Sequence, residues 1–185
     1  MNQQSSNLVL LTSIRTTCEH YSQSVGQKEI IEIGFGLVDK TTGQKYEPLS
    51  LFIKSKANIS KYCSDLTGIT QKDIEEGVSF DEALFYFLEN YEPKQYSAWA
   101  TYGNFTKDVL FNKLKSANSK WRPKASHINV QREFAVSVMK SEIAYGMKGA
   151  LAHIGLKDID NKSCEDEILN LGILYNEISK RRGLK

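Results

Sequence analysis

The first residues whose types suggest chemistry lie in the stretch LTSIRTTCEH, residues 11–20. This stretch follows the apolar run NLVLL and leads into polar residues, so it predicts the end of a buried strand turning into a loop. Acidic side chains would be expected at such a strand end in an α/β enzyme, but the sequence offers Ser13 and Arg15. The stretch is therefore either an active site that has lost its acids or a strand end that was never an active site.

The N-terminal part of the chain predicts three strands. Residues 7–13 form a short apolar run, and 28–38 are rich in β-branched residues. Turn residues that include Gly43 separate the second run from 45–54, so residues 28–54 predict an antiparallel hairpin. Pro48 cannot donate a ladder hydrogen bond, which places its position at an edge or a bulge.

The period of the apolar residues then changes towards 3.6, and capping residues mark several helices. Ser79 with Glu82, and Ser163 with Asp166, have capping-box spacing, and Asn104 is a candidate cap. The predicted helices are 59–66, 70–77, 79–91, 104–117, 131–140, 147–155 and 163–182, and the further strands are 95–103 and 126–130. This order predicts one α/β domain with a mixed sheet over residues 1–185, with 1–6 and 181–185 as flexible ends.

Composition limits the function classes. With 24 basic and 22 acidic residues, the formal charge of +2 provides no overall electrostatic drive towards nucleic acid. The three cysteines form no C-x-x-C pair, so a zinc site is not expected, and reduced thiols predict a cytoplasmic protein. The apolar runs are too short to span a bilayer, and the N-terminus lacks the pattern of a secretory signal, so no membrane association is expected.

Six stretches resemble, in order, the DEDDh branch of the DnaQ-like 3'-5' exonucleases, especially the small Eri-type and KapD-like proteins that act on RNA ends. The stretches are TTCEH, EIIEIGFGLVDKTTG, ISKYCSDLTGITQKDIEEGVSFDEAL, ATYGNF, SHINVQREFA and ALAHIGLK. CSDLTGITQ is the most specific of them. The resemblance implies an RNase H-like mixed sheet with flanking helices.

The resemblance also implies a set of catalytic positions, and this sequence departs from almost all of them. The family holds two divalent metals with carboxylates and uses a histidine as general base. Its Asp-x-Glu pair corresponds to Ser13 and Arg15, its helix aspartate to Thr106, its histidine to Lys162 and its last aspartate to Glu167. Because only Glu167 keeps a carboxylate, no catalytic residue set is intact and no resident metal is expected. Glu167 is the residual metal candidate.

The nucleotide-binding part of the family pattern is better kept. By resemblance, Leu66, Thr67 and Gly68 line a pocket for the terminal nucleotide, and Phe105 and Arg15 are further nucleotide-binding candidates. A competing explanation is that the turn at Gly68 is needed only for helix packing.

Two hypotheses follow from these residues. The first is a catalytically inactive exonuclease-like module that binds single-stranded RNA or DNA ends, or a protein partner, at the former cleft. In it Arg15 and Lys162 replace the metals as phosphate partners, since a guanidinium makes charge-assisted hydrogen bonds without a metal. The alternative is an active Mg- or Mn-dependent 3'-5' exonuclease with an atypical site. The carboxylates available to that site are Glu167, Asp166, Glu19 and Asp108.

Overall fold

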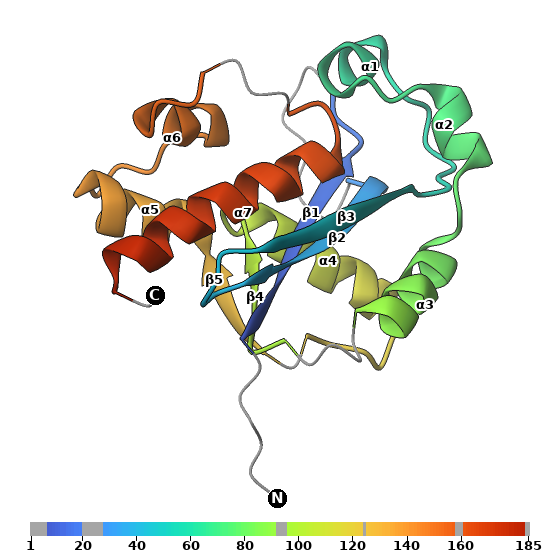
Figure 1. Ribbon diagram of the computed structural model, residues 1–185. Coiled ribbons are helices and arrows are strands. Elements are labelled where there is room, and N and C mark those ends of the chain that lie inside the picture. Colours follow the sequence, from blue (N-terminus) through green and yellow to red (C-terminus); the bar gives the residue numbers. More distant parts are fainter. Residues whose placement is uncertain (1–6, 20–27, 92–95, 124, 158–160, 184–185) are drawn as a thin grey trace, which may run out of the picture.

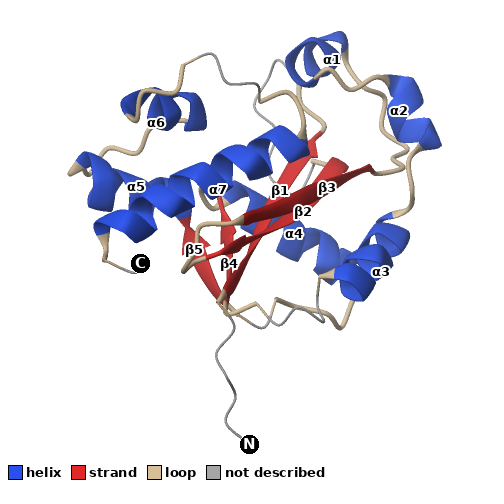
Figure 2. Ribbon diagram, viewed as in Figure 1, coloured by secondary structure: helices blue, strands red, loops and turns tan. Residues whose placement is uncertain are grey.

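A five-stranded mixed sheet runs through the centre of the protein, with helices on both faces (Figure 1). The computed structural model describes residues 7–19, 28–91, 96–123, 125–157 and 161–183. Helices α5, α6 and α7 lie on one face of the sheet, and α3 and α4 lie on the other (Figure 2). The α/β class and the mixed sheet predicted from the sequence are therefore confirmed.

The strands follow the order β3-β2-β1-β4-β5. Their bounds are β1 Leu8–Thr16, β2 Ile30–Asp39, β3 Lys45–Phe52, β4 Ala98–Thr101 and β5 Ser126–Asn129. The first three strands are antiparallel, whereas β4 and β5 run parallel to β1. Because parallel strands end at the same edge, the carboxyl ends of β1, β4 and β5 lie at one edge of the sheet, where α4 and α5 begin after β4 and β5.

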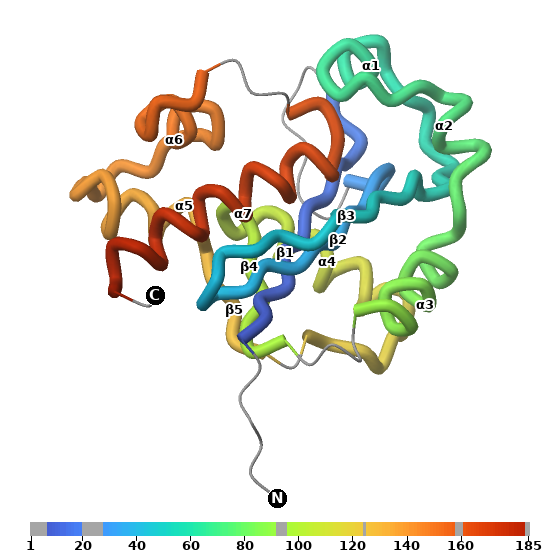
Figure 3. The backbone as a smooth tube through the Cα atoms, viewed as in Figure 1, coloured from blue at the N-terminus to red at the C-terminus, as the bar shows by residue number. Residues whose placement is uncertain are grey.

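Most helices begin at a side-chain cap, as their sequences predict. Their bounds are α1 Lys61–Thr67, α2 Gln71–Glu76, α3 Phe80–Asn90, α4 Phe105–Ser116, α5 Val130–Phe134, α6 Met147–His153 and α7 Cys164–Arg181. The capping boxes of Ser79 with Glu82 and of Ser163 with Asp166 are both formed. Asn104 occupies the N-cap position of α4, but its side chain makes no capping hydrogen bond. Helix α1 lies beyond the end at which β1 finishes (Figure 3).

Two further predictions need correction. The first strand does not end at residue 13 but continues to Thr16, because its pairing with β2 extends through Arg15 and Glu32. The helix predicted over 131–140 is split, since α5 ends at Phe134 and residues Ala135–Met139 form a π-helical turn, η3. Apolar spacing cannot separate these two helix types over so few residues.

Two hydrophobic layers result from the alternation of side chains along β1. Val9 and Leu11 point into the layer beneath α7, whereas Leu10 and Ile14 point into the layer beneath α3 and α4. Trp99 belongs to the second layer and is 2% exposed, so it is a core residue rather than a base-stacking platform. By the same alternation, Ser13 and Arg15 face α7.

The described part of the chain includes the whole of α7 but neither terminus. Residues 1–6 and 184–185, predicted to be flexible, lie outside the described residues. Arg181 is the last residue of α7, and the Arg182 guanidinium contacts the Glu133 carboxylate in α5. Within the described part of the chain, every helix is too short or too polar to cross a lipid bilayer.

Helix α7 approaches β2 closely because β2 has glycine where the two meet. A Cβ atom added at Gly34 would lie 2.7 Å from the Cβ atom of Cys164 and 2.8 Å from Cδ1 of Ile168. One added at Gly36 would lie 2.5 Å from Cγ2 of Ile168. A side chain at either position would therefore require α7 to move. The first turn of α7 carries residues of the candidate site.

We predict that Gly34→Ala lowers the free energy of unfolding by about 1–3 kcal/mol, because overpacking forces α7 away from the sheet. Urea denaturation measures the change. Gly146→Ala is the matched control, since no atom lies within 4 Å of the added Cβ there. Equal stability of the two variants would show that α7 adjusts at no cost.

Candidate functional site

Arg15 and Glu32 form a buried ion pair at the carboxyl end of β1. The two residues are cross-strand neighbours on β1 and β2, and Arg15 Nε lies 3.4 Å from Glu32 Oε2. Their side chains are 11% and 2% exposed. The guanidinium also donates a hydrogen bond from Nη2 to the backbone carbonyl of Asn161, over 2.8 Å. Arg15 is therefore held by internal partners on two sides.

The second oxygen of Glu32 accepts a hydrogen bond from the N-terminus of α7. Oε1 lies 3.0 Å from the backbone nitrogen of Cys164, the first residue of that helix. A carboxylate is stabilised there because the first backbone N–H groups of a helix lack intrahelical partners and carry a partial positive charge. Glu32 thus joins β1, β2 and α7 through a single side chain.

Glu167, the retained carboxylate, lies one turn further along α7. Burial raises the pKa of its carboxyl, and the Glu32 charge raises it further, whereas Ser13 and the Arg15 guanidinium lower it. Ser13 Oγ is buried without a well-formed hydrogen bond to any described residue, and the same holds for Arg15 Nε and Glu32 Oε2. Arg15 Nε and Glu32 Oε2 are paired with each other by charge at 3.4 Å, which leaves the Ser13 hydroxyl as a poorly satisfied polar group of the site. Such groups are uncommon in protein interiors outside functional positions.

The other positions predicted from the family pattern lie around this centre without completing a catalytic set. Thr106 is in the first turn of α4 and is 5% exposed. Asp166, considered as a substitute ligand, is engaged in capping α7, because its Oδ2 accepts hydrogen bonds from the backbone nitrogens of Lys162 and Ser163. Glu19 and Asp108 are both exposed.

These residues do not fit a pair of divalent metal ions. Mg²⁺ and Mn²⁺ sites of this kind need several converging carboxylate oxygens, whereas the residues that the sequence resemblance aligns with the family's acids include Ser13, Arg15 and Thr106, which offer none. The guanidinium also places a fixed positive charge beside Glu32, where it competes with a cation. Among the described residues, no group of three acidic, histidine or cysteine side chains is arranged to hold a metal.

The predicted nucleotide-pocket residues do lie together with part of this centre. A pocket of about 400 Å³ is lined by the segment from Asp65 to Ile69, by Phe52 and Glu32, and by Lys162 and Ser163 from the start of α7. Leu66 is 63% exposed at its rim. The structure therefore brings Leu66, Thr67 and Gly68 next to Lys162, although these segments are far apart in sequence.

Local hydrogen bonds explain the shape of this segment. Helix α1 is capped at its start by Ser60, whose side chain accepts from Cys63 N, and at its end by Gly68, which has a φ of 76°. That left-handed conformation favours glycine and reverses the chain. The buried Thr67 hydroxyl donates to the Cys63 carbonyl over 2.7 Å and accepts from Ile69 N over 3.2 Å. Thr67 is therefore buried and holds the shape of the pocket, whereas the exposed Leu66 side chain is available for contact with a ligand.

Cys18 and Cys63 approach one another where β1 meets α1. Cys63 is buried, and its thiol lies 3.7 Å from the Thr16 carbonyl oxygen. Burial, together with a contact to the Cys63 thiol, raises the pKa of Cys18 to about 12. Since the thiolate is the reactive form of cysteine, Cys18 is not an activated thiol, and Cys63 is a buried packing residue.

Phe105, the remaining nucleotide-binding candidate, is at the start of α4 rather than among the residues that line the pocket of Leu66. Its ring is 41% exposed, and the ammonium of Lys28 lies 5.5 Å from the ring centre. Sequence reasoning missed Lys28, Glu32 and Asn161. Of these, Glu32 could have been recognised, because it is the one charged residue within the apolar run IIEIGFGLV, residues 30–38.

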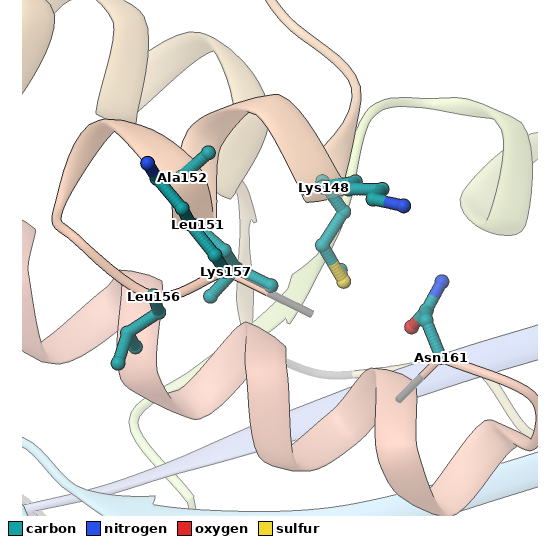
Figure 4. A pocket seen from close by; sticks show the side chains of 7 residues that line it. Lys148, Leu151, Ala152, Leu156, Lys157 and Asn161 are labelled. Carbon is teal, nitrogen blue, oxygen red and sulfur yellow. The ribbon is translucent and has the colours of Figure 1, made fainter. Parts of the chain in front are cut away.

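A second pocket adjoins the site between α6 and the segment that enters α7 (Figure 4). Its volume is about 320 Å³, and Leu151, Ala152 and Leu156 line its apolar part. Lys148 and Asn161 are also part of its lining. The Asn161 carbonyl that holds Arg15 therefore belongs to the wall between this pocket and the ion pair.

Comparison with known proteins identifies both a family model and a set of similar structures. The model of the exonuclease family RNase_T matches residues 17–162. No curated protein sequence matches the chain significantly. Among solved structures, the nuclease domain of 3'hExo, a DEDDh family member bound to rAMP, is 20% identical with a TM-score of 0.81. That match covers 96% of this chain and 94% of that one.

Two further structures share the fold. One describes the 3'-end specific recognition of histone mRNA stem-loop by a 3'-exonuclease, with 19% identity, a TM-score of 0.83 and coverage of 95% of this chain and 64% of that chain. The other is cell-death related nuclease 4 (CRN-4), with 18% identity, a TM-score of 0.78 and coverage of 94% and 64%. The chain thus spans under two thirds of these two proteins. These likenesses confirm the predicted RNase H-like exonuclease fold.

We predict that Arg15→Met lowers the free energy of unfolding by about 3 kcal/mol, because it leaves the Glu32 carboxylate buried without its cation. The double variant Arg15→Met/Glu32→Gln should recover most of this stability, as measured by urea denaturation. Lys61→Met is the control: it breaks the exposed pair with Asp65 and should cost less than about 1 kcal/mol. If Arg15→Met costs no more than this control, the buried pair does not stabilise the fold.

We predict that Glu167→Gln raises the melting temperature at pH 8 and has little effect at pH 4. The folded protein raises the pKa of this carboxyl above its ordinary 4.5, so the native state holds the proton more tightly than the unfolded state. The stability that Glu167 contributes is therefore fully present below about pH 4.5, the ordinary pKa, and is lost as the pH rises through the pKa of the folded state. Glu75→Gln, which removes an exposed carboxyl from α2, is the control. An effect that is the same at both pH values would contradict this assignment.

Proposed function

This chain belongs to the exonuclease family, and we propose that it is a member that binds the 3' end of a single-stranded nucleic acid without cleaving it. The observation that carries the proposal is the Arg15–Glu32 ion pair, because the sequence resemblance aligns Arg15 with a carboxylate that holds metal ions in the family. Glu167 alone offers a single acidic group to a metal, and burial raises its pKa. Two-metal hydrolysis is not supported by this donor set.

The binding half of the proposal rests on the pocket beside α1. The terminal nucleotide would enter the 400 Å³ space between Leu66 and the start of α7, with Lys162 at its side. The similar nuclease domain of 3'hExo was solved with rAMP, and another similar protein recognises a 3' end. Arg15, 11% exposed and already bonded to Asn161, acts in this proposal by keeping metal ions out more than by contacting phosphate.

The proposal places the protein in the cytoplasm and assigns it no resident cofactor. Cys18, Cys63 and Cys164 are all free thiols, which suits a reducing compartment. An Mg²⁺ or Mn²⁺ ion belongs only to the alternative, a working nuclease with an atypical site, in which Glu167 would be the residue that holds it.

The test uses end-labelled single-stranded RNA and DNA with a free or a blocked 3' end, with Mg²⁺, with Mn²⁺ and with a chelator. We expect retention of the free 3' end in all three conditions and no shortening of the strand. Leu66→Ser should weaken retention about tenfold, since fully burying a leucine side chain is worth about 1.5–3 kcal/mol. Phe85→Ser on α3 is the matched control, because Leu66 and Phe85 are 63% and 64% exposed.

Two outcomes would overturn the proposal. Metal-dependent shortening from the 3' end that is lost in Glu167→Gln would favour the atypical nuclease. If neither RNA nor DNA is retained at low salt, a protein partner at the same cleft becomes the better explanation.

A further inference from the structure

A polar pocket of about 430 Å³ lies on the other face of the sheet, away from α7. One side of it is formed by α4, through Val109, Asn112, Lys113 and Ser116. The opposite side is formed by two short segments, residues 28–29 before β2 and residues 54–56 after β3. Three separate parts of the chain therefore line a single opening.

Lysine is concentrated in this pocket. Lys28, Lys54, Lys56 and Lys113 are all lining residues, and Glu29 is the single carboxylate among them. The Glu29 carboxylate accepts a hydrogen bond from the Ser55 hydroxyl within the same pocket. The formal charge of the whole chain is only +2, so these residues produce a local positive field that the total charge does not show.

The four ammonium groups are not neutralised by their described surroundings. None of the ion pairs found among the described residues includes any of them. Lys28 and Lys113 lie instead over the aromatic rings of Phe105 and Phe80, at 5.5 and 5.6 Å from the ring centres. A further carboxylate, Glu82, interacts weakly with Lys54 but is bound to Ser79 N in the cap of α3. These lysines can therefore bind an external anion.

One lysine of the pocket, Lys28, contacts Phe105, a nucleotide-binding candidate outside the pocket. The exposed Phe105 ring begins α4 next to Thr106, and Lys28 contacts that ring from the lysine side. An exposed aromatic ring can stack a base, while lysines bind successive phosphates as point charges. An aromatic ring beside several lysines suits a nucleic-acid strand, with its bases and successive phosphates, better than a single small anion.

We propose that Lys28, Lys54, Lys56 and Lys113 form a second binding site, for the phosphates of a single-stranded nucleic acid upstream of its 3' end. The site is independent of base sequence, because it contacts the backbone only. The inference rests on the proposed function in one respect, namely that the ligand is a nucleic-acid strand. The pocket is large enough to hold more than one phosphate group, and its ammonium groups come from opposite sides.

The test compares the affinity of the full chain for a dinucleotide and for a twelve-nucleotide strand over a range of salt concentrations. Lys54→Gln/Lys113→Gln should weaken binding of the longer strand about tenfold at low salt and leave the dinucleotide unaffected. The slope of log K against log salt should become shallower by about 1.4, at about 0.7 for each phosphate that is no longer neutralised. A second variant, Lys54→Gln/Lys56→Gln, changes only exposed residues and should give the same result.

Lys72→Gln/Lys180→Gln is the matched control, since it removes the same charge from two lysines paired with Glu76 and Glu177 outside the pocket. An equal change of slope in this control would overturn the site, as would an unchanged slope in both pocket variants. Inorganic phosphate is the third arm: if it binds the pocket as tightly as the strand does, the ligand is a small phosphate and the strand proposal is wrong. If the strand depends on the lysines but shows no preference for a free 3' end, the second site stands and the proposed function fails.

Discussion

The Glu32 carboxylate, the Arg15 guanidinium and the N-terminus of α7 form the interaction that sets the geometry of the whole site. Burying a carboxylate, here 2% exposed, lowers stability unless the charge is paired and hydrogen-bonded. One oxygen of Glu32 accepts a hydrogen bond from the N-terminus of α7, and the other lies 3.4 Å from the Arg15 guanidinium. The three partners come from β1, β2 and α7. The position of α7 on the sheet, and with it the place of Glu167, Lys162 and Ser163, therefore follows from how this buried charge is paired.

The same pairing supports the proposal that this chain keeps the exonuclease fold without a two-metal catalytic site. In a two-metal site, carboxylates converge and the metal ions supply the positive charge that holds them together. In this chain a guanidinium supplies that charge covalently, so the strands and α7 need no metal to remain together. The pocket beside α1 is shaped by Ser60, Thr67 and Gly68, and the lysine pocket by α4 and the ends of two strands. Neither surface needs metal ligands, which is consistent with a protein that holds a strand rather than cutting it.

Neighbouring residues alone were sufficient to predict most of the helices and strands. Apolar alternation and capping residues such as Ser79 and Ser163 are local signals, so the strands and helices could be predicted with errors mainly at ends, as at Thr16 and at the π-helical turn. The sequence alone likewise shows that positions 13, 15 and 106 hold Ser13, Arg15 and Thr106 and no acidic residue.

Which side chains meet was settled only by the way the elements pack. From the sequence, Arg15 is a candidate partner for phosphate. In the structure it is paired with Glu32, which depends on the β1–β2 register, and it donates to the carbonyl of Asn161, which is 146 positions away in the chain. The four lysines of the lysine-rich pocket lie between residues 28 and 113 in the sequence. They line one pocket because α4 lies opposite the segment before β2 and the segment after β3. Such long-range contacts are set by the packing of whole elements, and no local sequence pattern encodes them.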